Sequence, residues 1–189
     1  MLDWLIGLDG QILLWIQAYV RLPFLDPIVV FYTHLGDAGL LWGGISLILI
    51  CFPRTRRAGI LSLAALALGG ILTNVALKQM VARTRPWHTV DGLTFLVMES
   101  DPHSFPSGHT CAAFAVAGVW FRALPRRWMR VTGIVMAVLM GLSRLYVGVH
   151  FPSDVLVGAM VGLLASWLAW KLGRYLPTLD GERKDHERV

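Results

Sequence analysis

The chain has 189 residues, enough for one domain, and it is 56% hydrophobic and only 15% charged. Soluble domains are about 45–50% apolar and about 25% charged, so this composition excludes an ordinary soluble protein and indicates a membrane protein. The formal net charge of +5 does not indicate a nucleic-acid partner, because the lysines and arginines lie mostly in short loops between apolar segments. Cys51 and Cys111 lie in or beside apolar segments and are expected to be small hydrophobic residues, with no disulfide and no metal site.

The first predicted element, residues 2–20, is an amphipathic helix. Apolar residues such as Trp4 and Trp15 recur at helical spacing, and polar residues such as Gln11 lie largely on the opposite face. A helix of this kind can lie in the membrane interface, with its aromatic rings at the level of the headgroups. We expect this position for an N-terminal segment of residues 1–22, and a sixth membrane span is the alternative.

Five further apolar segments are predicted to cross the membrane as helices, because a hydrocarbon core of about 30 Å requires about 20 apolar residues. They are residues 27–52, 57–82, 107–122, 129–147 and 152–174. The predicted fold is therefore all-α, a membrane bundle of five transmembrane helices with the N-terminal interfacial helix as a sixth. We expect a single domain over residues 1–176, with the helical bundle in residues 27–174 and a polar cytoplasmic tail in residues 177–189.

The basic loops predict the orientation of these spans. Residues 53–57 carry three arginines, residues 122–130 carry four, and the tail adds further basic residues. Five spans place all three groups on one side, which the positive-inside rule assigns to the cytoplasm. The loop 83–105 and the turn 143–154 then lie on the outer side, where a substrate anion would explain four basic residues that depart from the rule: Lys78, Arg83, Arg85 and Arg144.

Three sequence motifs lie at this outer face, in residues 78–86, 106–109 and 143–154. Each has an ordinary explanation when it is taken alone. Lys78 has the position of a lysine that reaches from a helix end to the membrane surface. The sequence Pro-Ser-Gly-His is a good helix start, although its glycine also lets a ligand approach the free N–H groups there.

His150 and Asp154 are four residues apart and would share one face of a helix. The carboxylate could then accept the Nδ1–H bond of the imidazole and leave Nε2 free as a nucleophile. A purely structural His–Asp pair is the alternative. Arg144, just before this turn, supplies a planar fork for phosphate oxygens.

Taken together, two histidines, an aspartate and three cations on one face fit phosphoryl transfer by covalent catalysis. His150 would attack phosphorus, and His109 would protonate the leaving oxygen and then activate water. The equatorial oxygens would be held by nearby backbone N–H groups and by four side chains: Lys78, Arg85, Ser107 and Arg144.

The pattern Lys-x6-Arg-Pro, Pro-Ser-Gly-His and Ser-Arg-x5-His-x3-Asp resembles the type 2 phosphatidic acid phosphatase superfamily, which also includes vanadium haloperoxidases and bacterial acid phosphatases. All eleven fixed residues of the three motifs are present, and the resemblance covers residues 27–174. It implies that Asp154 orients His150 and that Gly108 joins the phosphate-binding residues. It also implies that the reaction needs no metal and no other cofactor.

The expected function is that of a metal-independent lipid phosphatase, a multi-pass protein of the cell membrane with its site on the extracytoplasmic face. The expected partners are a phosphorylated lipid and the bilayer, and the sequence does not indicate an oligomeric state. Undecaprenyl diphosphate, hydrolysed to undecaprenyl phosphate through a phosphohistidine, is the favoured substrate, with phosphatidylglycerophosphate and phosphatidate as alternatives. A vanadate-dependent peroxidase and a non-catalytic lipid-binding module are the alternatives of another class.

Other polar residues are given structural interpretations. His34 and Asp37 interrupt the first span and are interpreted as a helix kink or a satisfied buried pair. His88, Glu99 and His103 lie in the outer loop and are interpreted as solvated loop residues.

Overall fold

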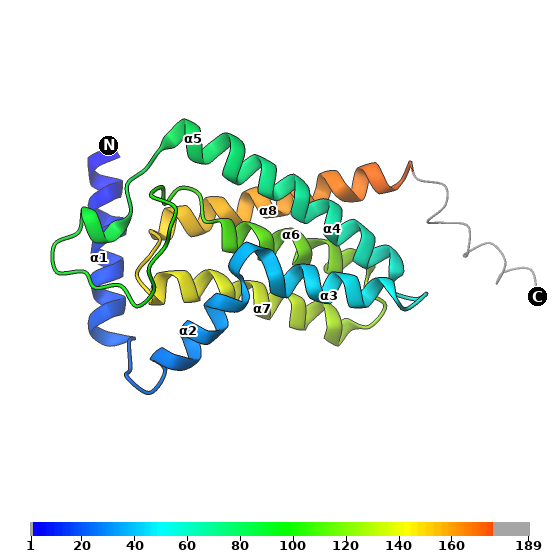
Figure 1. Ribbon diagram of the computed structural model, residues 1–189, viewed down its shortest axis with the longest axis horizontal. Coiled ribbons are helices and arrows are strands. Elements are labelled where there is room, and N and C mark those ends of the chain that lie inside the picture. The colour runs from blue at the N-terminus through cyan, green and yellow to red at the C-terminus, as the bar shows by residue number, and fades with distance from the viewer. Residues whose placement is uncertain (1, 176–189) are drawn as a thin grey trace, which may run out of the picture.

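The computed structural model describes residues 2–175 of the chain, with side chains from residue 7 onward. The predicted tail in residues 177–189 therefore lies outside the described residues. Between residues 2 and 175 there is no β-strand, and the chain forms a bundle of helices (Figure 1). The elements in chain order are α1 (Leu2–Tyr19), α2 (Asp26–Leu35), η1 (Asp37–Gly39), α3 (Leu40–Ile50), α4 (Arg56–Gly70), η2 (Ile71–Leu77), α5 (Lys78–Val81), η3 (Pro86–His88), α6 (Gly108–Ala123), α7 (Arg127–Tyr146) and α8 (Pro152–Gly173).

The predicted all-α membrane fold is confirmed, but two of the spans differ from the prediction in detail. The segment predicted as the first span is broken at η1, where Ala38 and Gly39 have φ angles of 50° and 73°, and α2 meets the following helical segment at 50°. The second span is continuous from Arg56 to Val81 and is apolar enough to cross a membrane, as are α7 and α8. Its η2 segment has π-helical hydrogen bonding, a rare geometry that is frequent at functional sites.

The helix α6 lies at the centre of the bundle and packs against α4, α7 and α8. It has only 16 residues, fewer than the roughly 20 that a full span requires. It matches the predicted third span, residues 107–122, in length. It begins at the cavity described below, which Gly108 lines, and not at the surface of the bundle.

Small residues allow α6 and α8 to approach closely. A Cβ atom added to Gly162 would lie 2.4 Å from the carbonyl oxygen of Cys111 and 2.9 Å from the amide nitrogen of Ala115, both on α6. Neither backbone atom can move away without displacing the helix. Close backbone approach of this kind is how membrane helices pack when no hydrophobic effect drives them together.

We therefore expect Gly162→Ala to destabilise the bundle by about 1–3 kcal/mol, the usual cost of overpacking. Thermal unfolding in detergent, followed by circular dichroism, measures the effect as a lower Tm. Gly44→Ala on α3 is the matched control, because an added Cβ there meets no atom within 4 Å. Equal Tm values for the two variants would contradict this account of the α6–α8 contact.

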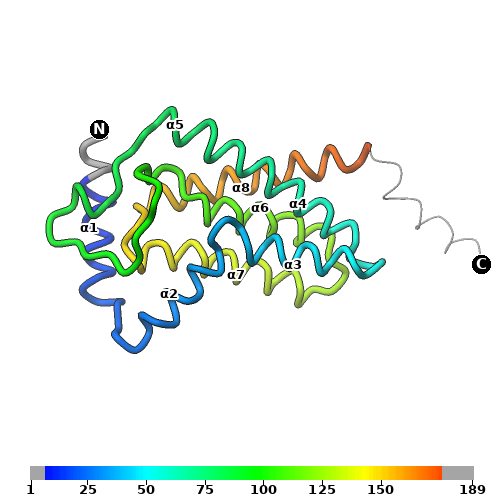
Figure 2. The backbone as a smooth tube through the Cα atoms, viewed as in Figure 1, coloured from blue at the N-terminus to red at the C-terminus, as the bar shows by residue number. Residues whose placement is uncertain are grey.

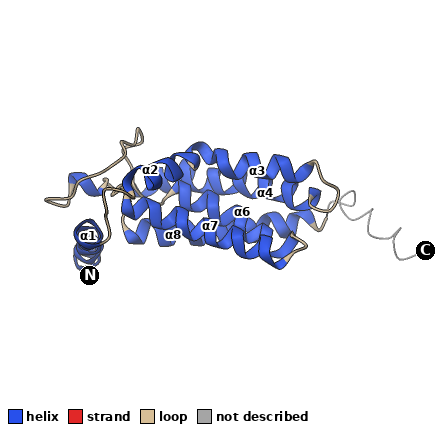
Figure 3. Cartoon of the chain, turned by 90° about the horizontal axis from the view of Figure 1, so that it is seen from below, coloured by secondary structure: helices blue, strands red, loops and turns tan. Residues whose placement is uncertain are grey.

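The N-terminal helix α1 crosses one end of the bundle. In Figure 3 it is seen along its own axis while the bundle helices are seen from the side. Apolar side chains cover its outer face, with Trp15 57% and Tyr19 74% exposed, whereas Asp9 and Leu13 on its inner face are buried. A helix that lies across the bundle end with its apolar side outward has the arrangement expected of an interfacial helix.

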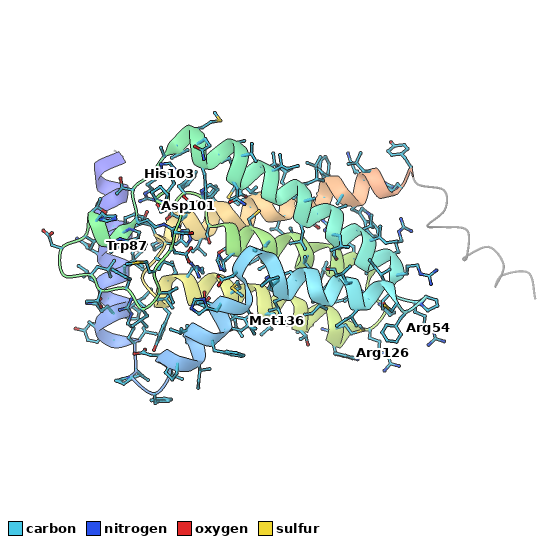
Figure 4. All side chains as sticks on the ribbon, viewed as in Figure 1. Arg54, Trp87, Asp101, His103, Arg126 and Met136 are labelled. Carbon is cyan, nitrogen blue, oxygen red and sulfur yellow. The ribbon has the colours of Figure 1, made fainter. Side chains whose placement is uncertain are left out.

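The segment between α5 and α6 closes the same end of the bundle, beside α1 (Figure 2). A backbone hydrogen bond from Leu96 N–H to the Val147 carbonyl, 3.0 Å long, holds it there, and a second from Ser104 N–H to the Arg83 carbonyl, 2.8 Å long, joins the two ends of the segment. Figure 4 places Asp101 and His103 of this segment at the end near α1, and Arg54 and Arg126 at the opposite end. The two basic loops therefore share one end of the bundle, as the sequence predicts.

Candidate active site

A cavity of about 520 Å³ opens at the end of the bundle beneath the α5–α6 segment. Five of the eight predicted site residues line it: Lys78, Arg85, Gly108, His109 and His150. The other three are buried and are joined to the lining by contacts described below: Ser107, Arg144 and Asp154. The tertiary structure thus brings the three sequence motifs together around one cavity.

His150 lies in the turn between α7 and α8 and is only 2% exposed. Its Nε2 atom is 3.4 Å from Nη1 of Arg85. Burial, followed by the positive charges of Arg144 and Arg85, lowers the pKa of His150 well below its ordinary value of 6.5. The ring is therefore neutral at pH 7, and Nε2 keeps the lone pair that a nucleophile requires.

Asp154 is fully buried at the start of α8 and approaches His150, with 3.5 Å between its Oδ2 atom and Nδ1 of the imidazole. The predicted Nδ1–H hydrogen bond is therefore not formed, although the two atoms are close. The same oxygen accepts a 2.9 Å hydrogen bond from the Phe151 amide, and Oδ1 accepts a 2.7 Å bond from Nη1 of Arg83. Among the residues that the structure describes, no side chain or backbone group makes a hydrogen bond to His150 Nδ1.

His109, in the first turn of α6, contacts a carboxylate that the sequence interpretation did not connect with it. Its Nε2 atom is 2.9 Å from Oδ1 of Asp37, whose Oδ2 is 2.9 Å from Nδ1 of His34. The predicted kink and the His34–Asp37 pair are both present, but the pair is about half-exposed and not buried. The signal for the missed contact was an acidic residue inside an apolar segment, which in membrane proteins marks a functional position.

The three cations of the site face two carboxylates from the α5–α6 segment. Lys78 pairs with Asp101, and the fully buried Arg144 pairs with Glu99 and donates a 2.6 Å hydrogen bond to Thr33. Arg85 donates to the carbonyl oxygens of Asp101 at 3.0 Å and Val149 at 3.1 Å, and lies 3.8 Å from Glu99.

Glu99 is therefore not the solvated loop residue that the sequence interpretation expected. The backbone bonds of the segment hold it over the cavity, and its side chain is 18% exposed. Burial alone would raise the pKa of Glu99, but the charge and the hydrogen bond of Arg144, with smaller contributions from His109 and Arg85, hold that pKa below its usual value. The carboxylate is thus ionised at neutral pH and occupies donors that an anionic ligand would need.

Ser107 and Gly108 form the start of α6. The Ser107 hydroxyl is buried and accepts hydrogen bonds from the amide of Thr110 at 3.4 Å and from its hydroxyl at 2.9 Å, so it caps the helix. That it contacts a phosphate stays a prediction. An added Cβ at Gly108 would come within 3.4 Å of Oδ1 of Asn74 in η2, so a side chain here would enter the space between α6 and η2.

The chain is similar to known phosphatases over most of its length. Residues 58–177 match the model of the PAP2 superfamily. The undecaprenyl-diphosphatase of Sulfolobus acidocaldarius is 32% identical over 152 residues, which cover 80% of this chain and 71% of that protein.

Two crystal structures share the fold. LpxE of Aquifex aeolicus has a TM-score of 0.75 and 28% identity, covering 85% of this chain and 93% of that one. The transmembrane PAP2-type phosphatidylglycerolphosphate phosphatase of Bacillus subtilis has a TM-score of 0.73 and 30% identity, covering 89% and 85%. With its motifs gathered around one cavity in a membrane bundle, the chain belongs to the PAP2 superfamily and is a membrane lipid phosphatase.

Proposed function

We propose that the protein hydrolyses undecaprenyl diphosphate to undecaprenyl phosphate and inorganic phosphate. The observation that carries the proposal is the convergence of Lys78, Arg85, His109 and His150 on one cavity at the end of a membrane bundle. The name of the Sulfolobus acidocaldarius relative supports the diphosphate substrate. The name of the Bacillus subtilis structure favours phosphatidylglycerophosphate as the second candidate.

The site is placed at the extracytoplasmic face of the cell membrane in this proposal. Arg54 and Arg126, from the two basic loops, lie at the end of the bundle opposite Asp101 (Figure 4). Positive loops are retained in the cytoplasm, so the end with the cavity faces outward. A lipid phosphate in the outer leaflet then meets the cations while its chain stays in the bilayer.

The proposed reaction begins with attack of His150 Nε2 on the terminal phosphorus in line with the leaving oxygen. Arg85, 3.4 Å from that nitrogen, is positioned to hold the phosphoryl group, and Lys78 and Arg144 supply further donors for the equatorial oxygens. Gly108 leaves room for the phosphate near the first backbone N–H groups of α6.

His109 donates a proton to the leaving oxygen as the phosphorus–oxygen bond breaks, which leaves a phosphoryl group on His150. The same ring then accepts a proton from water, and the resulting hydroxide attacks phosphorus and releases inorganic phosphate. Asp154 stabilises the positive charge on His150 during the first step. No step in this sequence requires a metal.

The lipid assay that tests the proposal compares undecaprenyl diphosphate, phosphatidylglycerophosphate and phosphatidate as substrates of the detergent-purified protein, with and without EDTA. We expect phosphate release in every EDTA sample, with the highest kcat/KM for the diphosphate. A higher kcat/KM for either glycerolipid would replace the proposed substrate, and loss of release in EDTA would contradict the metal-free reaction.

Binding of a phosphate must displace Glu99 from Arg144, since both compete for the same donors. We expect Glu99→Gln to lower the inhibition constant of vanadate, a phosphate analogue without a lipid chain, by about tenfold, because the loss of a competing charged hydrogen bond is worth about 1.4 kcal/mol or more.

Asp91→Asn is the matched control, because it removes the same charge from an exposed position of the same segment. Inhibition curves with and without each substitution give the comparison. An unchanged or weaker inhibition in Glu99→Gln would mean that the phosphate and Glu99 occupy different donors.

A further inference from the structure

The N-terminal helix carries a buried acid. Asp9 is 7% exposed although it lies on a helix whose outward face is apolar. A buried carboxylate is costly unless it is paired and hydrogen-bonded. Packing of α1 against the bundle gives no reason for a charge at this position, so the partners of Asp9 decide what it does.

Asp9 joins α1 to two other parts of the chain. Its Oδ2 atom accepts a 2.9 Å hydrogen bond from Nη2 of Arg83, in the α5–α6 segment. The Ser153 amide, in the first turn of α8, donates to Oδ1 at 3.2 Å, and the Ser153 hydroxyl donates to Oδ2. One carboxylate thus ties the N-terminal helix to the turn that follows His150.

Arg83 extends this connection to Asp154. Its Nη1 atom donates 2.7 Å hydrogen bonds to both the Ser153 hydroxyl and Oδ1 of Asp154, and its guanidinium lies over the Phe151 ring, 3.8 Å from the ring centroid. Each of its terminal nitrogens therefore contacts one carboxylate, and the planar fork fixes both in orientation.

The two oxygens of Asp154 have different partners. Oδ1 binds Arg83, and Oδ2 receives the Phe151 amide and lies 3.5 Å from Nδ1 of His150. The bond from Arg83 holds the carboxylate at the angle that keeps Oδ2 beside the imidazole. Without Arg83, a fully buried carboxylate would lose its charge partner, and it would turn or take up a proton instead of supporting His150.

We infer that Arg83 is a positioning residue for the reaction, holding Asp154 against His150, and that Asp9 of the N-terminal helix holds Arg83 in turn. The inference rests on the proposed role of His150 as the nucleophile. It makes α1 a supporting part of the active site.

The structure offers a control that separates this role from the docking of α1. Arg21, just after α1, donates to the Tyr146 carbonyl at 2.6 Å and to the Thr94 hydroxyl at 2.9 Å. These bonds also fix α1 to the bundle, but they do not contact Asp154. Arg21→Gln therefore loosens the same helix without disturbing the proposed chain of contacts.

The test measures kcat and KM for undecaprenyl diphosphate in Arg83→Gln, Arg83→Lys, Asp9→Asn and Arg21→Gln, each checked for Tm in detergent. Loss of a supporting hydrogen-bond partner commonly costs about 10- to 100-fold in activity. We expect a fall of this size in kcat for Arg83→Gln with KM within about twofold of wild type, since Arg83 does not line the cavity. Arg83→Lys should recover part of the loss, Asp9→Asn should show a smaller loss, and Arg21→Gln should keep kcat.

A double-mutant cycle with Asp154→Asn decides between positioning and general damage. If Arg83 acts through Asp154, adding Arg83→Gln to Asp154→Asn should reduce kcat no further. A full additional loss in that background, or an equal loss in Arg21→Gln, would overturn the inference. Failure of the proposed function would look different, because the wild-type protein itself would then release no phosphate from undecaprenyl diphosphate.

Discussion

His150→Ala is expected to reduce phosphate release by at least about 10⁴-fold, because removal of the attacking group from a covalent enzyme costs on this order or more. The side chain is 2% exposed, and its Nε2 lies beside Arg85 at the cavity. The measurement is release of inorganic phosphate from undecaprenyl diphosphate by protein purified in detergent.

Rapid quenching of the reaction gives an independent readout of the same prediction. Wild-type protein mixed with substrate labelled in the terminal phosphate should carry a label that is stable to base and labile to acid, as a phosphohistidine is. The variant should carry none. His88→Ala, at an exposed histidine of the outer segment, is the matched control and should keep both the label and the rate. Labelling of His150→Ala would assign the nucleophile to another residue.

The pH profile of the wild-type protein follows from the same environment. Burial and the neighbouring cations lower the pKa of His150 well below 6.5, so the ring stays neutral as the pH falls from 7 through 6.5. The acid limb of kcat/KM that reports protonation of the nucleophile should therefore lie well below pH 6.5. An acid limb at the ordinary histidine pKa would mean that His150 is not buried among cations in the free enzyme.

The second large effect is expected for His109→Ala, which should lower turnover of the lipid substrate by about 10²- to 10⁴-fold, the usual contribution of a general acid or base. His109 lines the cavity and lies 2.9 Å from Asp37. Both of its proposed steps, protonation of the leaving oxygen and activation of water, move a proton. The loss should therefore depend on the leaving group.

Nitrophenyl phosphate tests that dependence, because nitrophenolate leaves without a proton. We expect His109→Ala to release about one equivalent of nitrophenol per protein in a burst and then to turn over slowly, since the phosphohistidine forms but is not hydrolysed. Wild-type protein, which hydrolyses the intermediate, should continue at its steady rate. A variant that shows no burst would lack an active nucleophile, and one with normal turnover would not need His109 as a base.

Part of this protein is determined by the sequence alone. Long apolar segments separated by basic loops predict a helical membrane protein and its orientation, because both signals depend on composition within one segment. The three motifs predict a phosphate site because each is a short local stretch of sequence. The alternation of spans then places all three motifs at one end of the bundle. In the structure Lys78, Arg85, His109 and His150 line one cavity.

The contacts that complete the site depend on tertiary structure. Asp37 reaches His109 only because η1 breaks the first span. Glu99 faces Arg144 because the outer segment is held over the cavity by bonds to distant backbone groups. Asp37 and Glu99 belong to no local sequence motif, so the residues next to them in the chain do not predict which side chains they contact.

The hydrogen bonds that hold Asp154 in place are the clearest example of contacts that depend on tertiary structure. Asp9 and Asp154 are 145 residues apart in the chain and meet through Arg83, which contacts both. The sequence predicts that His150 and Asp154 interact, because residues four apart on a helix share a face. The contacts of Arg83 and Asp9 cannot be predicted in this way, because a hydrogen bond between distant segments depends on how the helices pack and not on spacing along the chain.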